Sequence, residues 1–190
     1  LAEQTAQMMR RIFAPKAHGA WTLQNGSMGR SLHACMLFSS IAALYYSVGQ
    51  ANYAAANECL DALAAHQMLR GQHATSVQWG PWAGVGMAAG NSINARMRAA
   101  GIGLISEAQG LSALEAALRP SAPTIVAVTP VQWNLLLQKK NVPALLSVIE
   151  LLFAEGSDAH QRCRGVLPVE VSRGTVCFGQ SAGVFHYSGV

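Results

Sequence analysis

The chain has 190 residues, of which 51% are hydrophobic and 12% charged, and its formal net charge is +4. This length allows one domain with a sizeable core, and the low charge content favours an α/β domain with a buried parallel sheet. The basic residues are scattered rather than gathered in a stripe, which argues against a nucleic-acid-binding surface.

The cysteines indicate the cellular compartment and argue against a metal site, and the apolar runs argue against a membrane-spanning helix. None of the four cysteines lies in a Cys-x-x-Cys motif. Free thiols in a reducing compartment are therefore expected, in the cytoplasm or an organellar stroma rather than after secretion. The spacing of His160, Cys163, Cys177 and His186 fits no zinc module, so no metal site is predicted. No apolar run approaches the ~20 residues that a membrane-spanning helix needs.

The first elements are a helical region and a strand. Residues 1–24 are expected to be helical, with Pro15 opening a second helix, where its missing N–H costs nothing. The apolar run 34–38 then predicts a buried strand. This strand ends in two hydroxyl side chains, Ser39 and Ser40.

An Ala-rich segment predicts a helix over residues 51–68. Tyr53 and Asn57 are four positions apart, so they share one face of this helix. Leu60 and Leu63 are expected to pack inward. The charged and polar positions are expected to form a solvated face, namely Glu58, Asp61 and His66.

The rest of the chain predicts two more strands and their connecting helix. The strands are expected at 74–79 and 124–129, the second as the last of the sheet, with a helix beginning at Ser106 between them. A trailing helix is expected at 141–155. Residues 156–190 have six glycines and little periodicity, which predicts a linker, a disordered tail or the start of another unit.

Residues 84–89 match Gly-x-Gly-x-x-Ala literally, but the context is wrong for a dinucleotide fingerprint. That motif needs the first strand of a βαβ unit directly before it and an acidic residue about twenty positions later. Here Pro81 and Trp82 precede the glycines, and no Asp or Glu follows until Glu107. The glycines are therefore interpreted as close-approach and hinge residues.

Four ordered motifs carry a family resemblance: Phe-Ser-Ser-Ile-Ala, Gly-Gln-Ala-Asn-Tyr-Ala-Ala-Ala-Asn, Leu-Asp-Ala-Leu-Ala and Trp-Gly-Pro-Trp-Ala-Gly-Val-Gly-Met-Ala. Over residues 14–140 the chain resembles the ketoreductase domain of modular polyketide synthases, in the short-chain dehydrogenase/reductase superfamily. The resemblance implies a Rossmann-like doubly wound parallel sheet. Residues 1–140 would be the C-terminal, catalytic part of the domain. The first strands and the Gly-rich turn would lie outside this chain, and that absent half would be a partner of it.

The resemblance also implies a catalytic set. Lys16 matches the active-site lysine in Pro-Lys-x-x-Gly-x-Trp-x-Leu, and Ser40, thirteen residues before Tyr53, is preferred over Ser39 as the catalytic serine. Asn57 would hold the lysine or a relay water. Most short-chain reductases have the lysine four residues after the tyrosine, whereas multidomain reductases exchange lysine and asparagine. This sequence has the exchanged arrangement.

These residues suit the reduction of a ketone. A phenol titrates near pH ~10, and a nearby ammonium favours the phenolate. Tyr53 would therefore be the general acid, assisted by Lys16, while Ser40 would donate a hydrogen bond to the carbonyl oxygen.

The cofactor implied by the family is NADPH, and the substrate is a β-ketoacyl chain tethered by phosphopantetheine to an acyl carrier protein, in polyketide or related fatty acid biosynthesis. The residues expected at the cofactor are Lys16, Tyr53, Pro81, Trp82, Gly84 and Val85. The substrate cleft is expected to contain Tyr45, Gln50 and Met87, with residues 91–103 as a lid. The alternative interpretation is a non-catalytic structural half-domain of a megasynthase.

Overall fold

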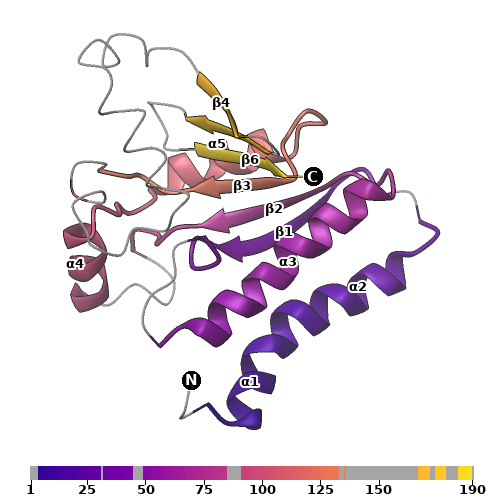
Figure 1. Cartoon of the computed structure of the whole chain (residues 1–190), viewed down its shortest axis with the longest axis horizontal. Helices are drawn as coiled ribbons and strands as arrows, with labels where there is room; N and C mark the ends of the chain where they lie inside the picture. The colour runs from indigo at the N-terminus through magenta and orange to yellow at the C-terminus, as the bar shows by residue number, and fades with distance from the viewer. Residues whose placement is uncertain are drawn as a thin grey trace.

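A computed structural model describes residues 4–30, 32–44, 49–84, 91–132 and 135, together with three strands near the C-terminus (Figure 1). The helical elements are α1 (Ala6–Phe13), a π-helical turn (Ala14–His18), α2 (Gly19–Ser27), α3 (Ala51–Leu69), α4 (Asn91–Ala99) and α5 (Glu107–Ala117). The strands are β1 (Cys35–Ser40), β2 (Ala74–Trp79), β3 (Ile125–Val128), β4 (Leu167–Val171), β5 (Gly174–Phe178) and β6 (Val184–Gly189).

The six strands form one sheet in the order β1-β2-β3-β6-β5-β4. β1, β2 and β3 are parallel, and their register aligns Ser40 with Trp79 and Trp79 with Val128. The carboxyl ends of the three strands therefore meet at one edge of the sheet, where open α/β folds place their sites. The predicted α/β fold with a parallel sheet is confirmed.

The central strand β2 is buried along its whole length because helices cover both faces of the sheet (Figure 1). Its side chains alternate between the two faces. Val77 and Trp79 belong to the apolar core, with Ala113 and Ala117 of α5. Ser76 and Gln78 contact α3 on the opposite face. The Val77–Trp79 side of β2 therefore contributes to the apolar core, and the Ser76–Gln78 side presents buried polar groups to α3.

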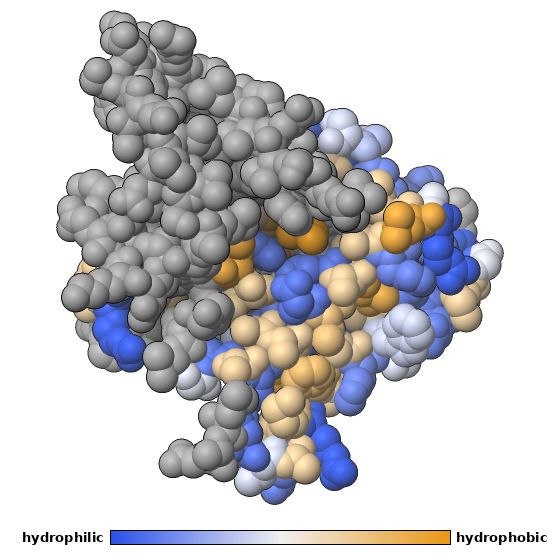
Figure 2. Space-filling model, in the orientation of Figure 1, coloured by the Kyte–Doolittle hydropathy of each residue, from blue (hydrophilic) through white to orange (hydrophobic). Residues whose placement is uncertain are grey.

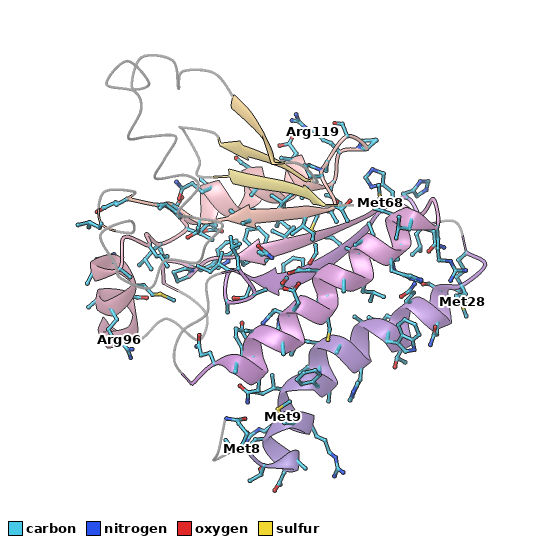
Figure 3. All side chains as sticks on the ribbon, viewed as in Figure 1. Met8, Met9, Met28, Met68, Arg96 and Arg119 are labelled. Atoms are coloured by element: carbon cyan, nitrogen blue, oxygen red, sulfur yellow. The ribbon has the colours of Figure 1, made fainter. Side chains whose placement is uncertain are left out.

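The helices α1 and α2 form an outer layer beside α3 (Figure 1). Hydrophilic and apolar side chains are interspersed over the face that they form (Figure 2). Met8 and Met9 lie on α1, and Met28 lies just after α2 (Figure 3). The large apolar side chains exposed on this layer are Met8, Met9, Trp21, Leu23 and Met28.

Pro15 does not open a second helix, so that prediction is wrong. It lies inside the π-helical turn, which joins α1 to α2 without a break. The Gly19 N–H donates to the Ala14 carbonyl, five residues earlier, and to the Lys16 carbonyl. A π-helical turn has a looser hydrogen-bond pattern than an α-helix. It therefore tolerates proline, which has no backbone N–H to donate.

Two predictions about the C-terminal region are also wrong. β3 is not the last strand, because β6 pairs with it in the antiparallel direction. The expected linker or disordered tail contains β4, β5 and β6, joined as antiparallel neighbours. β5 and β6 contain β-branched and aromatic residues, β4 contains two valines, and turn-forming residues separate the strands in the sequence. The trailing helix expected at 141–155 lies outside the described residues.

Candidate active site

The serine strand ends with two hydroxyl side chains in different environments. Ser39 is buried, and its Oγ donates to the Asn57 carbonyl on α3 at 3.3 Å. Ser40 is half-buried, and its Oγ accepts a hydrogen bond from the Ala42 N–H at 3.2 Å. Because Ser40 Oγ is an acceptor in this contact, its own hydrogen is free to be donated to another group. Ser39 connects strand to helix, whereas Ser40 can offer a donor at the edge of the sheet.

Tyr53 and Asn57 lie one turn apart near the start of α3, as the spacing predicted. The Asn57 side chain is fully buried, and its Nδ2 donates to the Tyr53 carbonyl at 2.7 Å. Within the described part of the chain, Asn57 Oδ1 has no hydrogen-bond partner. A buried amide oxygen without a partner is costly, so this atom is suited to accept a hydrogen bond from an ammonium or a water.

Lys16 reaches this pair from the π-helical turn. Its Nζ donates to the Phe38 carbonyl at 3.1 Å and lies 5.5 Å from the centre of the Tyr53 ring. Burial lowers the pKa of Lys16, and the negative charge of Asp61 opposes that effect. The structure thus brings together three segments that are distant in the sequence: the turn with Lys16, the strand with Ser40 and the helix with Tyr53.

Asp61 is part of the same region, contrary to the prediction that it lies on a solvated face. Only 1% of the residue is exposed, and its carboxylate accepts hydrogen bonds from Ser76 Oγ at 2.6 Å and Gln78 Nε2 at 2.7 Å. Burial raises the pKa of Asp61, while these two donors, Ser39 and the Lys16 charge work in the opposite direction. Asp61 follows Asn57 by four residues, so it shares the inward face of α3.

The sequence contains a pattern that indicates the burial of Asp61. Ser76 and Gln78 alternate with apolar residues in a strand that was expected to be buried. Polar side chains inside a central strand need polar partners from the covering helix. The only acidic residue on the Tyr53–Asn57 face of that helix is Asp61.

The residues predicted at the cofactor have mixed placements. Pro81 is buried, and Gly84 is exposed with φ of 80°, a left-handed conformation that favours glycine. The Trp82 ring lies 5.1 Å from that of Trp79 and packs directly on Gly110 of α5. The Trp82 side chain is therefore a packing residue in this structure. Val85 lies outside the described residues.

Of the predicted substrate-cleft residues, Gln50 is exposed and is the N-cap of α3, one residue before the helix that carries Tyr53. Tyr45 and Met87 lie outside the described residues. The expected lid contains α4, with Met97 half-buried and Ile102 buried. Among the described residues, no cluster of three metal-ligating side chains occurs, and no helix is long and apolar enough to cross a membrane.

The chain is similar to known proteins of one family. Residues 1–84 match the family described as KR domain. This part of the chain belongs to the KR-domain family. It covers part of the ketoreductase domain, and the match includes the segments that carry Lys16, Ser40, Tyr53 and Asn57.

The chain is similar to polyketide synthases and to solved ketoreductase structures. The chain is 45% identical over 121 residues to the spectinabilin polyketide synthase system protein NorB of Streptomyces orinoci, an alignment of 62% of this chain and 6% of that protein. PlmKR1, a ketoreductase from the first module of phoslactomycin biosynthesis in Streptomyces sp. HK803, is 36% identical with a TM-score of 0.66, covering 72% of this chain and 31% of PlmKR1. A structure of A-type ketoreductases from a modular polyketide synthase gives 33% identity and a TM-score of 0.74, covering 80% and 33%.

Proposed function

We propose that this KR-domain chain supplies the catalytic part of an NADPH-dependent reductase, which converts a carrier-protein-bound β-ketoacyl thioester to the β-hydroxyacyl thioester. The observation that carries the proposal is the position of Lys16. Its Nζ lies beside the Tyr53 ring and is bonded to the strand that ends in Ser40. A cation in this position has a clear use in ketone reduction, because it favours negative charge on the phenol oxygen.

The described residues fit the nicotinamide half of such a cofactor. An ammonium has three donors, and Lys16 uses one of them on the Phe38 carbonyl, so donors remain for ribose hydroxyls. The Oδ1 of Asn57, which has no partner among the described residues, supplies a buried acceptor one turn along α3 from Tyr53. When bound, NADPH supplies the hydride. We propose Lys16 and Tyr53 as the groups that hold its ribose, with Pro81, the backbone of Trp82, Gly84 and Val85 contributing from the loop after β2.

Tyr53 is the proposed general acid. Reduction of a carbonyl places negative charge on its oxygen, which must be stabilised and then protonated. Tyr53 gives its phenolic proton to that oxygen. The charge left on the phenol is stabilised by the Lys16 ammonium. A charge within a partly buried site interacts more strongly than it would in water, because the surrounding dielectric is low.

Ser40 and Asn57 are the other two residues of the proposed catalytic set. The Ser40 hydroxyl hydrogen is donated to the substrate carbonyl oxygen, a contact that preorganisation makes worth about 3–4 kcal/mol. Asn57 Oδ1 accepts from the Lys16 ammonium or from a water that returns a proton to Tyr53. The Asn57–Tyr53 hydrogen bond fixes the amide in the helix while it does this.

The substrate and the carrier protein are part of the proposal. The relatives are polyketide synthases, and the chain spans only 6% of the Streptomyces orinoci protein. Gln50, at the start of α3, and the segments with Tyr45 and Met87 are proposed to contact the acyl chain.

The proposal is tested with the intact protein that carries these residues. A β-ketoacyl N-acetylcysteamine thioester is supplied with NADPH or NADH, and the product is identified by mass spectrometry. We expect a β-hydroxyacyl product and a faster reaction with NADPH. Ser40→Ala should lower the turnover about 10²-fold, whereas Ser27→Ala, on α2, should not lower it. A wild-type protein that yields no hydroxyl product would contradict the proposal.

A further inference from the structure

Asp61 is a buried acid that the proposed mechanism leaves without a task. It lies on α3, eight residues after Tyr53 and four after Asn57, and points at the polar face of β2. Its two oxygens are contacted separately, one by Ser76 at 2.6 Å and the other by Gln78 at 2.7 Å. Both partners are hydrogen-bond donors. A group with two acceptor oxygens and two donors facing them has the pattern of an ionised carboxylate.

A buried carboxylate needs more than neutral donors to remain charged. The charged side chains that act on Asp61 among the described residues are Lys16, from the π-helical turn, and Glu58, three residues earlier on α3. β1 and β2 present only neutral groups to it: Ser39, Ser76 and Gln78. Glu58 repels the Asp61 charge, whereas Lys16, in the described part of the chain, is the cation that favours it.

Lys16 in turn needs a negative charge nearby to remain protonated. Burial lowers its pKa, which favours the neutral amine, and the Asp61 charge raises it again. The two side chains form no direct ion pair in the described residues, so the attraction acts through the low-dielectric space between α3 and β1. β1 also links them mechanically, since Lys16 bonds to Phe38 O and the neighbouring Ser39 pairs with Gln78 in the sheet.

We propose that Asp61 is the buried counter-ion of Lys16, a positioning residue that keeps this lysine charged beside Tyr53. The inference rests on the proposed function, because a charged Lys16 matters for catalysis only if Tyr53 is the proton donor. Asp61 contacts neither substrate nor cofactor. It acts on the reaction through Lys16, and its effect is therefore a change in the pH range over which the site works.

The first test measures Lys16 itself. Lysine-selective isotope labelling of the intact protein allows the titration of Lys16 to be followed by NMR, with Lys16→Arg used to assign the signal. Asp61→Asn retains the shape of the side chain and removes the charge. We expect the ratio of charged to neutral Lys16 at a given pH to fall about tenfold, a change of about one pH unit in the midpoint. Glu58→Gln, which removes an exposed charge from the same helix, should not lower this ratio.

The second test is the pH–rate profile of ketone reduction. Without Asp61, the Lys16–Tyr53 pair loses its first proton more easily, so the alkaline limb should move to lower pH in Asp61→Asn. Ser76→Ala removes one donor and leaves the charge. It should weaken the packing of α3 on β2 without moving that limb toward lower pH.

The outcomes separate this inference from the proposed function. If the wild-type protein reduces ketones and Asp61→Asn leaves the Lys16 titration unchanged, Asp61 is not the counter-ion. The same conclusion holds if Ser76→Ala and Asp61→Asn shift the profile equally, because the effect would then be structural. If Lys16 titrates as expected but no ketone is reduced, the counter-ion pair stands and the proposed reaction is wrong. If Asp61→Asn does not fold, a Lys16 titration in Ser76→Ala that matches the wild type supports the pair, and a tenfold fall overturns it.

Discussion

The Lys16 ammonium donates a 3.1 Å hydrogen bond to the backbone carbonyl of Phe38, twenty-two residues later in the chain. This bond connects the π-helical turn to the strand that ends in Ser40. Because a backbone carbonyl cannot rotate away, it holds the ammonium next to the Tyr53 ring. Loss of the lysine should therefore alter both the charge and the geometry of the site.

Lys16→Ala should lower kcat/KM for a β-ketothioester by on the order of 10²-fold at neutral pH. The remaining activity should have its alkaline limb at higher pH, because the charge that favours the phenolate is gone. This is opposite to the shift expected for Asp61→Asn. Arg10→Ala, which removes an exposed cation from the same helical segment, is the matched control. An unchanged profile for Lys16→Ala would mean that the lysine has no role in proton transfer.

Asn57→Ala should lower kcat less than Lys16→Ala does, by about tenfold. A water can occupy part of the space of the lost amide and accept the same hydrogen bond. The hydrogen bond from the Asn57 side-chain Nδ2 to the Tyr53 backbone carbonyl is also lost, so the KM for NADPH should rise slightly. His66→Ala, exposed on the same helix, should match the wild type in both parameters. A loss as large as that of Lys16→Ala would assign Asn57 a direct catalytic role.

Stability near Asp61 should depend on pH in a defined direction. Burial raises the pKa of Asp61 above the ordinary 3.8. At a pH between 3.8 and this raised pKa, the folded protein therefore retains a proton that the unfolded chain releases. Folding stability must then fall as pH rises through that interval. Asp61→Asn removes this dependence, so the stability of α3 in the variant relative to wild type should be greater at pH ~7 than at pH ~4. Amide hydrogen exchange in α3, corrected for intrinsic rates, measures the difference, and an equal effect at both pH values would contradict the prediction.

Gly110→Ala should destabilise the domain through Trp82. A Cβ at Gly110 would lie 2.1 Å from the nearest ring atom of Trp82, and that ring is also packed against Trp79. We expect a loss of about 1–3 kcal/mol, since the ring must move. Gly26→Ala is the control, because a Cβ there meets nothing within 4 Å. Equal unfolding midpoints for the two variants would show that α5 moves away without cost.

The parts of the fold that depend on local patterns could be predicted from the sequence. The apolar runs of β1 and β2 and the Ala-rich run of α3 give strong periodic signals, and Ser106 forms the capping box that begins α5. The grouping of Lys16, Ser40, Tyr53 and Asn57 was implied by the family resemblance of the motifs, and the structure brings Lys16, Tyr53 and Asn57 to one region. Ser40 lies at the adjacent strand end.

The remaining features depend on tertiary context. Asp61 was expected in solvent because charged residues are rarely buried, and only the polar face of β2 makes its burial possible. The packing of the Trp82 ring also depends on tertiary context, because the absence of a side chain at Gly110 provides the space for it. β6 pairs with β3 across a separation of more than fifty residues, which no local pattern encodes.

The most direct test of the central claim is Tyr53→Phe in the intact protein, which removes the phenolic hydroxyl and retains the ring beside Lys16. Turnover of a β-ketothioester and the dissociation constant for NADPH are measured on the same preparation. The account predicts that turnover falls by at least about 10²-fold while the dissociation constant changes less than about threefold. Turnover within about tenfold of the wild type, with NADPH binding intact, would show that Tyr53 is not the proton donor.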